Sequence, residues 1–338
     1  MIVEPKVREF ICTTAHPQGC RENVREQIAY VKKQNITGGP KKVLVIGAST
    51  GYGLASRITA AFGCHAATLG IMFEKPSNGK RTATPGWYNT AAFEEEAAKE
   101  GLYAKSINGD AFSKEVKEQA ISMIRQDLGK VDMVIYSLAA PRRTDAQGKT
   151  WVSSLKTTDK PFTEKSLDLR TNTIVTKTVE PAGEGELEGT VKVMGGEDWM
   201  DWIDALKEAD VLEKDAVTVA YSYIGPELTY PIYYDGTIGQ AKRHLTKTAG
   251  EINEKYQDVK AYISVNKALV TQASAAIPIV PLYFAILYKV MKEQGTHEGC
   301  IQQIARLFKD KLLAEHVPAD EKYQIRMDDW ELDKKVQD

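Results

Sequence analysis

Short apolar runs alternate along the chain with segments whose apolar residues recur at the spacing of an amphipathic helix. The apolar runs predict strands over residues 42–47, 66–73, 102–107, 131–138, 217–221 and 259–265. The helical spacing predicts helices over residues 55–62, 91–100, 114–128 and 237–256. Strands that alternate with helices indicate βαβ units with right-handed crossovers. The pattern therefore predicts an α/β protein with a doubly wound parallel sheet.

Three further segments flank or interrupt this pattern, and we assign them to the same single domain. Residues 1–40 are an N-terminal addition with a helix over 23–33. Residues 141–214 are too long for an ordinary crossover, and we interpret them as an insertion that covers the site. Residues 296–338 carry helical patterns and end without a helix C-cap signal, so we expect the natural chain to continue further. The nucleotide-binding core is then formed by residues 41–140 and 215–295.

Within the insertion, the local composition predicts strands over 173–179 and 190–193 and a helix over 198–209. The later segment 268–288 carries no charge and is long enough to span a bilayer. It contains several polar residues, including Thr271, and two prolines, and it follows a strand directly. We therefore predict a buried helix that lines an apolar cavity, and no membrane span.

Composition and charge exclude some classes of function. The net charge of −2 over 338 residues gives no basis for broad affinity for nucleic acid or membranes. Charged residues within the first ten positions exclude a signal-peptide core there. The four cysteines form no CxxC pair, which is typical of a reduced, cytoplasmic protein. Cys12, His16 and Cys20 have no second ligand cluster, so no metal is expected.

A glycine-rich turn, Gly47 to Gly53, lies between the first predicted strand of the core and its helix. Glycine permits a tight turn there, and the following helix N-terminus can bind a diphosphate. An ordinary strand–helix turn would look the same, but Glu74 ends the next strand 21 residues past Gly53. That spacing suits a carboxylate that bonds the adenosine ribose, and its charge would repel the 2′-phosphate of NADPH. The sequence therefore predicts a Rossmann-type site for NADH.

Other strand ends supply weaker candidates for the same cofactor. Asp110 is placed to bond the adenine, and small residues after the fourth strand would let the cofactor lie close. Thr271 fits either a cofactor contact or a simple helix N-cap. The full predicted set is Gly47, Ser49, Thr50, Gly51, Tyr52, Gly53, Phe73, Glu74, Asp110, Ala111, Leu138, Ala139, Lys242, Val270 and Thr271.

Tyr233 and Lys242 form the candidate catalytic pair. Nine positions on one helix would turn the two side chains to opposite sides. They can cooperate only if Tyr233 precedes the helix and Lys242 lies on it, and Asp235 is a suitable N-cap between them. Tyr223, at the preceding strand end, is a third candidate that faces the same pocket.

These motifs together resemble one family, the trans-2-enoyl-CoA reductases, which includes the V-type enoyl-ACP reductases of bacteria. The resemblance covers the whole chain and is strongest to the clostridial members that reduce crotonyl-CoA. The Tyr-x8-Lys spacing is specific to that family, whereas ordinary short-chain dehydrogenases use Tyr-x3-Lys. The Tyr-x3-Lys pair of Tyr288 and Lys292 follows the last nucleotide strand and is treated as a decoy. Where some members carry a second lysine after the motif, this chain has Arg243. The matching segments are 16–20, 47–53, Glu74, 137–141, 195–199, 221–226, 233–242 and 270–274.

The resemblance implies a short-chain dehydrogenase superfamily fold and NADH-dependent reduction of a 2-enoyl thioester carried by CoA or acyl carrier protein. Hydride would reach C3 of the substrate, and Tyr233 would donate a hydrogen bond to the enolate oxygen. Lys242 would favour the phenolate of Tyr233 and hold the nicotinamide ribose. A monomer is expected. Residues implied at the substrate are Tyr223, Ser274, Ala275 and Ile277.

Two other functions share the same cofactor site. One is a short-chain dehydrogenase that reduces a keto thioester or oxidises an alcohol. The other is a non-catalytic regulator that binds NAD(H), in which Tyr233 and Lys242 would have no place at the nicotinamide.

Overall fold

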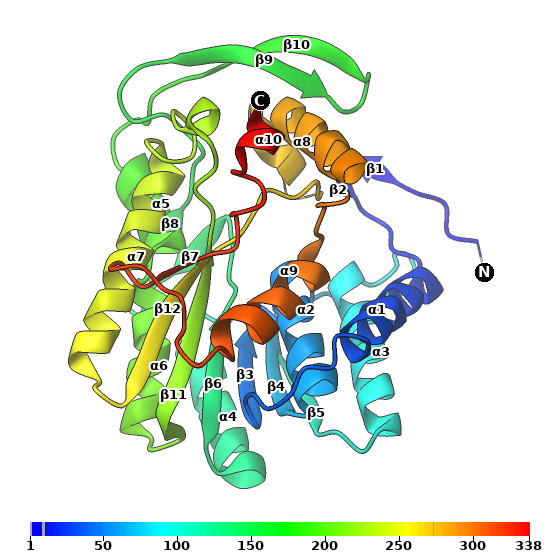
Figure 1. The fold of residues 1–338 in the computed structure, drawn as a ribbon, viewed down its shortest axis with the longest axis vertical. Coiled ribbons are helices and arrows are strands. Elements are labelled where there is room, and N and C mark those ends of the chain that lie inside the picture. The colour runs from blue at the N-terminus through cyan, green and yellow to red at the C-terminus, as the bar shows by residue number, and fades with distance from the viewer. Residues whose placement is uncertain (1, 9–10, 273) are drawn as a thin grey trace.

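A computed structural model describes residues 2–8, 11–272 and 274–338. Its centre is a seven-stranded sheet in which all neighbouring strands are parallel (Figure 1). In spatial order the strands are β13 (Gln324–Arg326), β12 (Val259–Val265), β11 (Leu212–Ser222), β6 (Val131–Tyr136), β3 (Lys42–Ile46), β4 (Ala67–Met72) and β5 (Ala104–Asn108). The strands predicted from the apolar runs are confirmed. The seventh, β13, lies where only helix was predicted.

Helices cover both faces of the sheet. One face carries α1 (Pro17–Lys32), α2 (Gly51–Ile58) with its π-helical continuation (Thr59–Gly63), α3 (Pro85–Lys99), and α9 (Cys300–Arg306) with its continuation (Leu307–Leu312). The other carries α4 (Lys114–Met123) with its continuation (Ile124–Leu128), α6 (Glu197–Glu208) and α7 (Thr237–Lys255). Alternate residues of each strand point to opposite faces. In β3, Val43 and Val45 join one buried cluster while Leu44 and Ile46 join the other. Burial on both faces explains why the strands appear in the sequence as continuous apolar runs.

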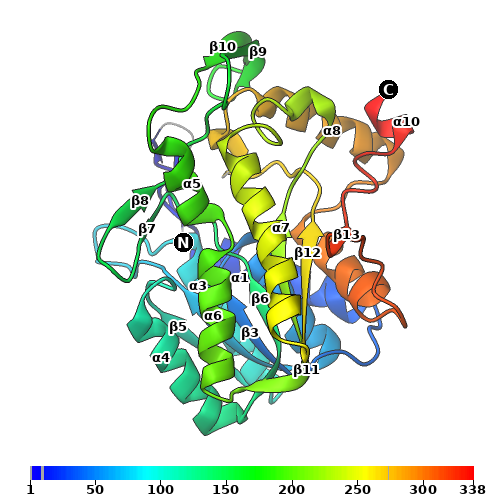
Figure 2. The ribbon, with the colours of Figure 1, turned by 90° about the vertical axis from the view of Figure 1, so that its left-hand side faces the viewer.

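The insertion contributes two hairpins and two helices. The hairpins are β7 (Arg142–Thr144) with β8 (Thr150–Val152), and β9 (Phe162–Asp168) with β10 (Thr173–Val179). Helix α5 (Glu186–Met194) packs on α7, and β9 packs on α8 (Val280–Gln294). Figures 1 and 2 show β9, β10, α8 and the terminal α10 (Lys334–Gln337) at one end of the molecule. A short hairpin, β1 (Val7–Arg8) with β2 (Ile11–Cys12), precedes α1.

Three sequence predictions of secondary structure were wrong. Residues 190–193 belong to α5, because Thr190 and Val193 are buried on a helix that packs against α7. Helix α3 begins at Pro85, since proline is well suited to the first turn of a helix. The uncharged segment is not one buried helix: a 3₁₀ turn covers Ser274–Ala276, and α8 starts only at Val280.

Helix α8 also differs from the prediction in its environment. Its side chains Ile286 and Tyr288 are 54% and 42% exposed, so only one side of the helix is buried. None of the described helices is long and apolar enough to cross a membrane.

A buried ion pair joins the insertion to the core. The Lys117 ammonium on α4 lies 2.6 Å from one Asp198 oxygen on α6, and the Tyr136 hydroxyl donates to the other. Burial raises the pKa of Asp198, and the Lys117 charge opposes that shift. An uncompensated charge at this depth would be strongly destabilising.

We expect Lys117→Met to lower the free energy of unfolding by about 3–5 kcal/mol, because it leaves the Asp198 carboxylate buried without its cation. The matched control is Lys114→Met on the same helix, whose exposed pair with Glu118 contributes at most about 1 kcal/mol. Urea unfolding followed by circular dichroism measures both. Equal effects of the two substitutions would contradict the prediction.

Candidate active site

The glycine-rich turn brings three backbone segments into direct contact. Gly47 has a positive φ of 85°, and a Cβ there would lie 2.2 Å from the Ser137 carbonyl oxygen. A Cβ on Gly53 would lie 1.9 Å from the Gly47 carbonyl oxygen. Any side chain at either position would separate α2 from the ends of β3 and β6. These two glycines are therefore required for the packing itself.

The first turn of α2 is open toward solvent. The N-cap residue Thr50 makes no side-chain hydrogen bond to the helix, and a Cβ on Gly51 would meet nothing within 4 Å. An uncapped helix N-terminus with an unobstructed glycine favours an anion. The residues present therefore fit the diphosphate of a dinucleotide. The Tyr52 hydroxyl instead bonds the Lys267 carbonyl and the Gln303 amide, so only its backbone is free for such a ligand.

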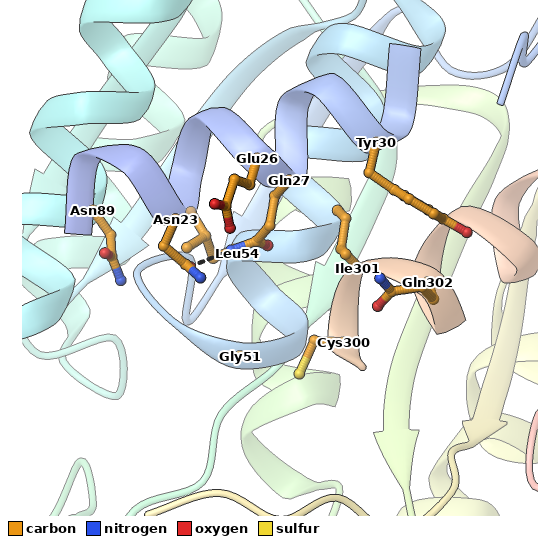
Figure 3. Close-up of a pocket in the computed structure, with 10 residues that line it drawn as sticks. All are labelled: Asn23, Glu26, Gln27, Tyr30, Gly51, Leu54, Asn89, Cys300, Ile301 and Gln302. Carbon is orange, nitrogen blue, oxygen red and sulfur yellow. Dashed lines mark hydrogen bonds between the residues drawn. The ribbon is translucent and has the colours of Figure 1, made fainter. Parts of the chain in front are cut away.

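A cavity of about 400 Å³ adjoins this turn between α1, α2 and α9 (Figure 3). Neither Tyr233 nor Lys242 lines it. Asn89, one of the lining residues, donates to the Ser49 carbonyl at 3.1 Å and so supports the turn from α3. No local pattern in the sequence indicates this cavity, because its walls come from helices far apart in the chain. The lining residues are Asn23, Glu26, Gln27, Tyr30, Gly51, Leu54, Asn89, Cys300, Ile301 and Gln302.

Glu74 lies beside the glycine-rich turn, as predicted. Its carboxylate accepts a hydrogen bond from the Ser49 hydroxyl at 2.6 Å. The Asn108 side chain holds the Glu74 backbone. Its carbonyl oxygen accepts from the Glu74 amide, and its amide nitrogen donates to the Glu74 carbonyl. A Cβ on Gly86, at the start of α3, would lie 2.0 Å from a Glu74 carboxylate oxygen. The sequence analysis did not identify Gly86 or Asn108 as residues of the site. For Gly86, its place directly after a helix-starting proline could have indicated a close contact.

The remaining predicted cofactor residues differ in whether a ligand could reach them. Phe73 is 77% exposed beside Glu74, and Ala139 is exposed after β6. The Asp110 carboxylate caps its own turn by accepting from the Phe112 amide. Ala111 is buried, and its carbonyl accepts from Lys117 and Trp202.

Leu138 and the loop after β12 complete this set. The Leu138 side chain packs against the position of Gly47, which places it at the turn. Val270 is 55% exposed. The Thr271 hydroxyl accepts a hydrogen bond from the Ser274 amide. It therefore caps the 3₁₀ turn, which corresponds to the capping role that was one of the two predicted for it.

Tyr233 lies in the turns before α7 and Lys242 lies on that helix, as the spacing required. The N-cap is Gly236 and not Asp235, because the Asp235 amide and carbonyl are already bonded to Tyr230 and Thr158. A residue that was not anticipated makes the arrangement possible. A Cβ on Gly239 would lie 2.0 Å from the Tyr233 carbonyl oxygen, so glycine lets this turn fold back onto the first turn of α7.

Tyr223 and Tyr233 pack edge to face with ring centroids 4.7 Å apart. The Tyr223 hydroxyl donates to Glu331 at 2.8 Å. Among the residues that the structure describes, no group hydrogen-bonds the Tyr233 hydroxyl. Tyr233 therefore carries the hydroxyl that is available to a ligand.

The predicted electrostatic coupling between Lys242 and Tyr233 is wrong. Burial and, second, the Glu331 charge raise the pKa of Tyr233, so its neutral phenol is favoured and not its phenolate. The Lys242 ammonium donates to the Tyr221 carbonyl at 3.1 Å and not to Tyr233. Burial lowers the pKa of Lys242 to about 8. Both groups thus respond mainly to loss of water.

Of the predicted substrate residues, Ile277 lies beside the tyrosine pair. Ile277 packs against the buried apolar cluster that contains Tyr233, Phe284 and Leu287. Ser274 is held by Thr271, and the Ala275 amide also bonds the Thr271 carbonyl. The described residues contain no group of three or more potential ligands able to hold a metal ion.

Two models of known protein families match this chain. The pattern described as the trans-2-enoyl-CoA reductase catalytic region matches residues 81–313. The pattern described as the NAD(P)H binding domain of trans-2-enoyl-CoA reductase matches residues 2–79. This chain belongs to the trans-2-enoyl-CoA reductase family. The carbonyl-reducing and non-catalytic alternatives are therefore not supported.

Individual relatives agree over the full length of the chain. A trans-2-enoyl-CoA reductase [NADH] of Clostridium perfringens is 60% identical, over 100% of this chain and 87% of the relative. An enoyl-[acyl-carrier-protein] reductase [NADH] of Flavobacterium johnsoniae is 59% identical, over 100% of this chain and 86% of the relative. The crystal structure of Treponema denticola trans-2-enoyl-CoA reductase in complex with NAD superposes with a TM-score of 0.96 at 51% identity, covering 100% of this chain and 87% of that one.

The contact at Gly86 predicts how cofactor preference is set. Gly86→Ala should push the Glu74 carboxylate away from Ser49, because the added methyl would overlap it. We expect the preference for NADH over NADPH to narrow, as it should for Glu74→Ala. Steady-state kinetics with each cofactor measure the ratio of kcat/KM. Gly79→Ala, in the exposed loop after β4, is the control for unspecific effects, and an unchanged ratio in both Gly86→Ala and Glu74→Ala would exclude this role.

The pKa of Lys242 predicts a pH dependence of cofactor binding. Its ammonium loses its proton as the pH rises through about 8, and with it the attraction for an anionic dinucleotide. We expect the Kd for NADH to increase between pH 7 and pH 9 in the wild type. In Lys242→Met this change should disappear. Fluorescence titration of NADH at each pH tests it, and an identical pH dependence in both proteins would refute the assignment.

Proposed function

We propose that this enzyme uses NADH to reduce the C2=C3 double bond of trans-2-enoyl thioesters to the saturated acyl thioester. Membership of the family and the names of its relatives support the reaction class. The observation that carries the assignment of roles is Tyr233, whose side chain is buried and neutral and whose hydroxyl has no hydrogen-bond partner among the described residues.

The glycine-rich turn and Glu74 are proposed to hold the dinucleotide. The first turn of α2 takes the diphosphate, and the Glu74 carboxylate accepts from the ribose hydroxyls. Bound NADH supplies the hydride that reaches C3 of the substrate, and uptake of a proton from solvent at C2 of the resulting enolate completes the saturated thioester. The half-buried Lys242 on α7 is proposed to orient the nicotinamide ribose.

Tyr233 is proposed to stabilise the charge that develops on the thioester oxygen. A neutral phenol is the form that can donate a hydrogen bond, and the raised pKa of Tyr233 keeps it neutral across the physiological range. The apolar cluster around it excludes water, so the bond to a developing negative charge is strong. Tyr223 is a poorer candidate because its single proton is already donated to Glu331.

Ser274, Ala275 and Ile277 are proposed to contact the acyl chain next to Tyr223. The support is that Ile277 packs on the cluster that contains Tyr233. The two relatives of nearly equal identity carry CoA and acyl carrier protein in their names, so the proposal is for the thioester that both carriers share. The net charge of −2 gives no overall attraction for an acidic carrier protein, which favours CoA.

We further propose that the enzyme works in the cytoplasm as a monomer. The four cysteines are free thiols, as a reducing compartment keeps them. Light scattering of the purified protein tests the monomer.

The role of Tyr233 predicts a loss of turnover without a loss of cofactor. Tyr233→Phe should lower kcat for crotonyl-CoA by about 10²–10³, the usual effect of removing one oxyanion donor. NADH affinity and the fold should be unchanged. Tyr223→Phe is the matched control on the neighbouring ring and should lose less. If Tyr223→Phe is the more damaging change, Tyr223 is the donor; if wild type reduces acetoacetyl-CoA and not crotonyl-CoA, the proposed reaction is wrong.

A further inference from the structure

Glu331 lies beside Tyr223 although it follows the last strand of the sheet. Its side chain is fully buried. One carboxylate oxygen accepts from the hydroxyls of Tyr223 and Tyr283, each at 2.8 Å. The other accepts from the Ala268 amide at 2.6 Å. The carboxylate thus binds three parts of the chain: the end of β11, helix α8 and the loop after β12.

These contacts decide what Tyr223 can do. A phenol has one proton to donate, and that of Tyr223 is directed at Glu331. The ring of Tyr223 in turn packs edge to face against Tyr233 and, at 6.1 Å, against Phe284. Holding the Tyr223 hydroxyl therefore also fixes the surface on which the Tyr233 ring rests.

A purely structural role would not need this choice of partners. The segment that contains Glu331 is already anchored by Asp329, whose two carboxylate oxygens accept from Arg306 of α9. A fully buried carboxylate at Glu331 costs further desolvation. Its oxygens are directed to the tyrosine beside Tyr233 and to the loop that begins the proposed acyl wall.

We propose that Glu331 is a positioning residue that occupies the Tyr223 hydroxyl, and so fixes the Tyr233 ring and leaves Tyr233 as the one donor to the substrate oxygen. This rests on the proposed function. Tyr223 without its acceptor would compete for the thioester oxygen or leave Tyr233 without a fixed neighbour. Either change moves the donor away from its productive position.

The test is a double-mutant cycle of Glu331 and Tyr223, assayed for NADH oxidation with crotonyl-CoA. Glu331→Leu should lower kcat by about 10- to 100-fold, as expected for a misplaced catalytic group, with KM for NADH unchanged. Glu331→Gln, which keeps an acceptor oxygen, should restore most of the loss. In the Tyr223→Phe background, Glu331→Leu should cause little further loss, because the hydroxyl that needed the acceptor is gone.

The double variant also protects the test against misfolding. Tyr223→Phe with Glu331→Leu leaves one fewer buried polar group unpaired than Glu331→Leu alone, so the double variant should be the more stable of the two. The comparison of that double variant with Tyr223→Phe then carries the test. Asp329→Asn, which weakens the bond to Arg306 of α9, is the control for a loosened C-terminal segment and should lower Tm with kcat retained.

Two results would overturn the proposal. In one, Glu331→Leu lowers kcat by the same factor in the wild type and in the Tyr223→Phe background. That result means that Glu331 does not act through Tyr223. The other is an equal kcat loss in Asp329→Asn, which means that Glu331 acts only by anchoring the segment. A wild-type enzyme that fails to reduce crotonyl-CoA would instead contradict the proposed function.

Discussion

The close approach of Gly53 to the Gly47 carbonyl is the constraint on which the cofactor half of the site depends. With a Cβ only 1.9 Å from that oxygen, no residue other than glycine leaves α2 in contact with the ends of β3 and β6. The same contact sets the position of Ser49 and, through it, of the Glu74 carboxylate. The proposed recognition of the diphosphate and of the ribose therefore has one steric origin.

The part of the site that contains Tyr233 and Lys242 also depends on a close backbone contact at a glycine. Gly239 lets the turn that carries Tyr233 lie on the helix that carries Lys242. Enclosure of the two side chains then shifts their pKa values in opposite directions, upward for Tyr233 and downward for Lys242. In both cases loss of water disfavours the charged form. The site is thus built for a neutral hydrogen-bond donor, and not for a phenolate activated by a cation.

The sequence predicted what depends on local pattern and missed what depends on contacts between distant segments. The sheet was predictable because strands buried on both faces are apolar throughout, and Glu74 because its distance from the glycine turn is fixed by one βαβ unit. Strand β13 has only three residues, too few for a periodic signal. Thr190 and Val193 favour a strand by composition, but packing on α7 makes them helical.

The same limit applies to the site. The order of Tyr233, a turn and then the helix of Lys242 followed from spacing, whereas the partner of each side chain did not. Glu331 is 108 residues from Tyr223, and no local feature near residue 331 indicates that it enters the site.

That separation has a consequence for the order in which the protein acquires activity during synthesis. Residues that form the cofactor turn emerge from the ribosome early, and the contact of Ser49 with Glu74 closes over only 25 positions. The acceptor for Tyr223 emerges only after the sheet strands up to β13 have been made. Because non-local contacts form late, a nascent chain would hold a nucleotide turn before its tyrosine pair is fixed. Binding competence and catalytic competence are therefore separate stages in the life of each molecule.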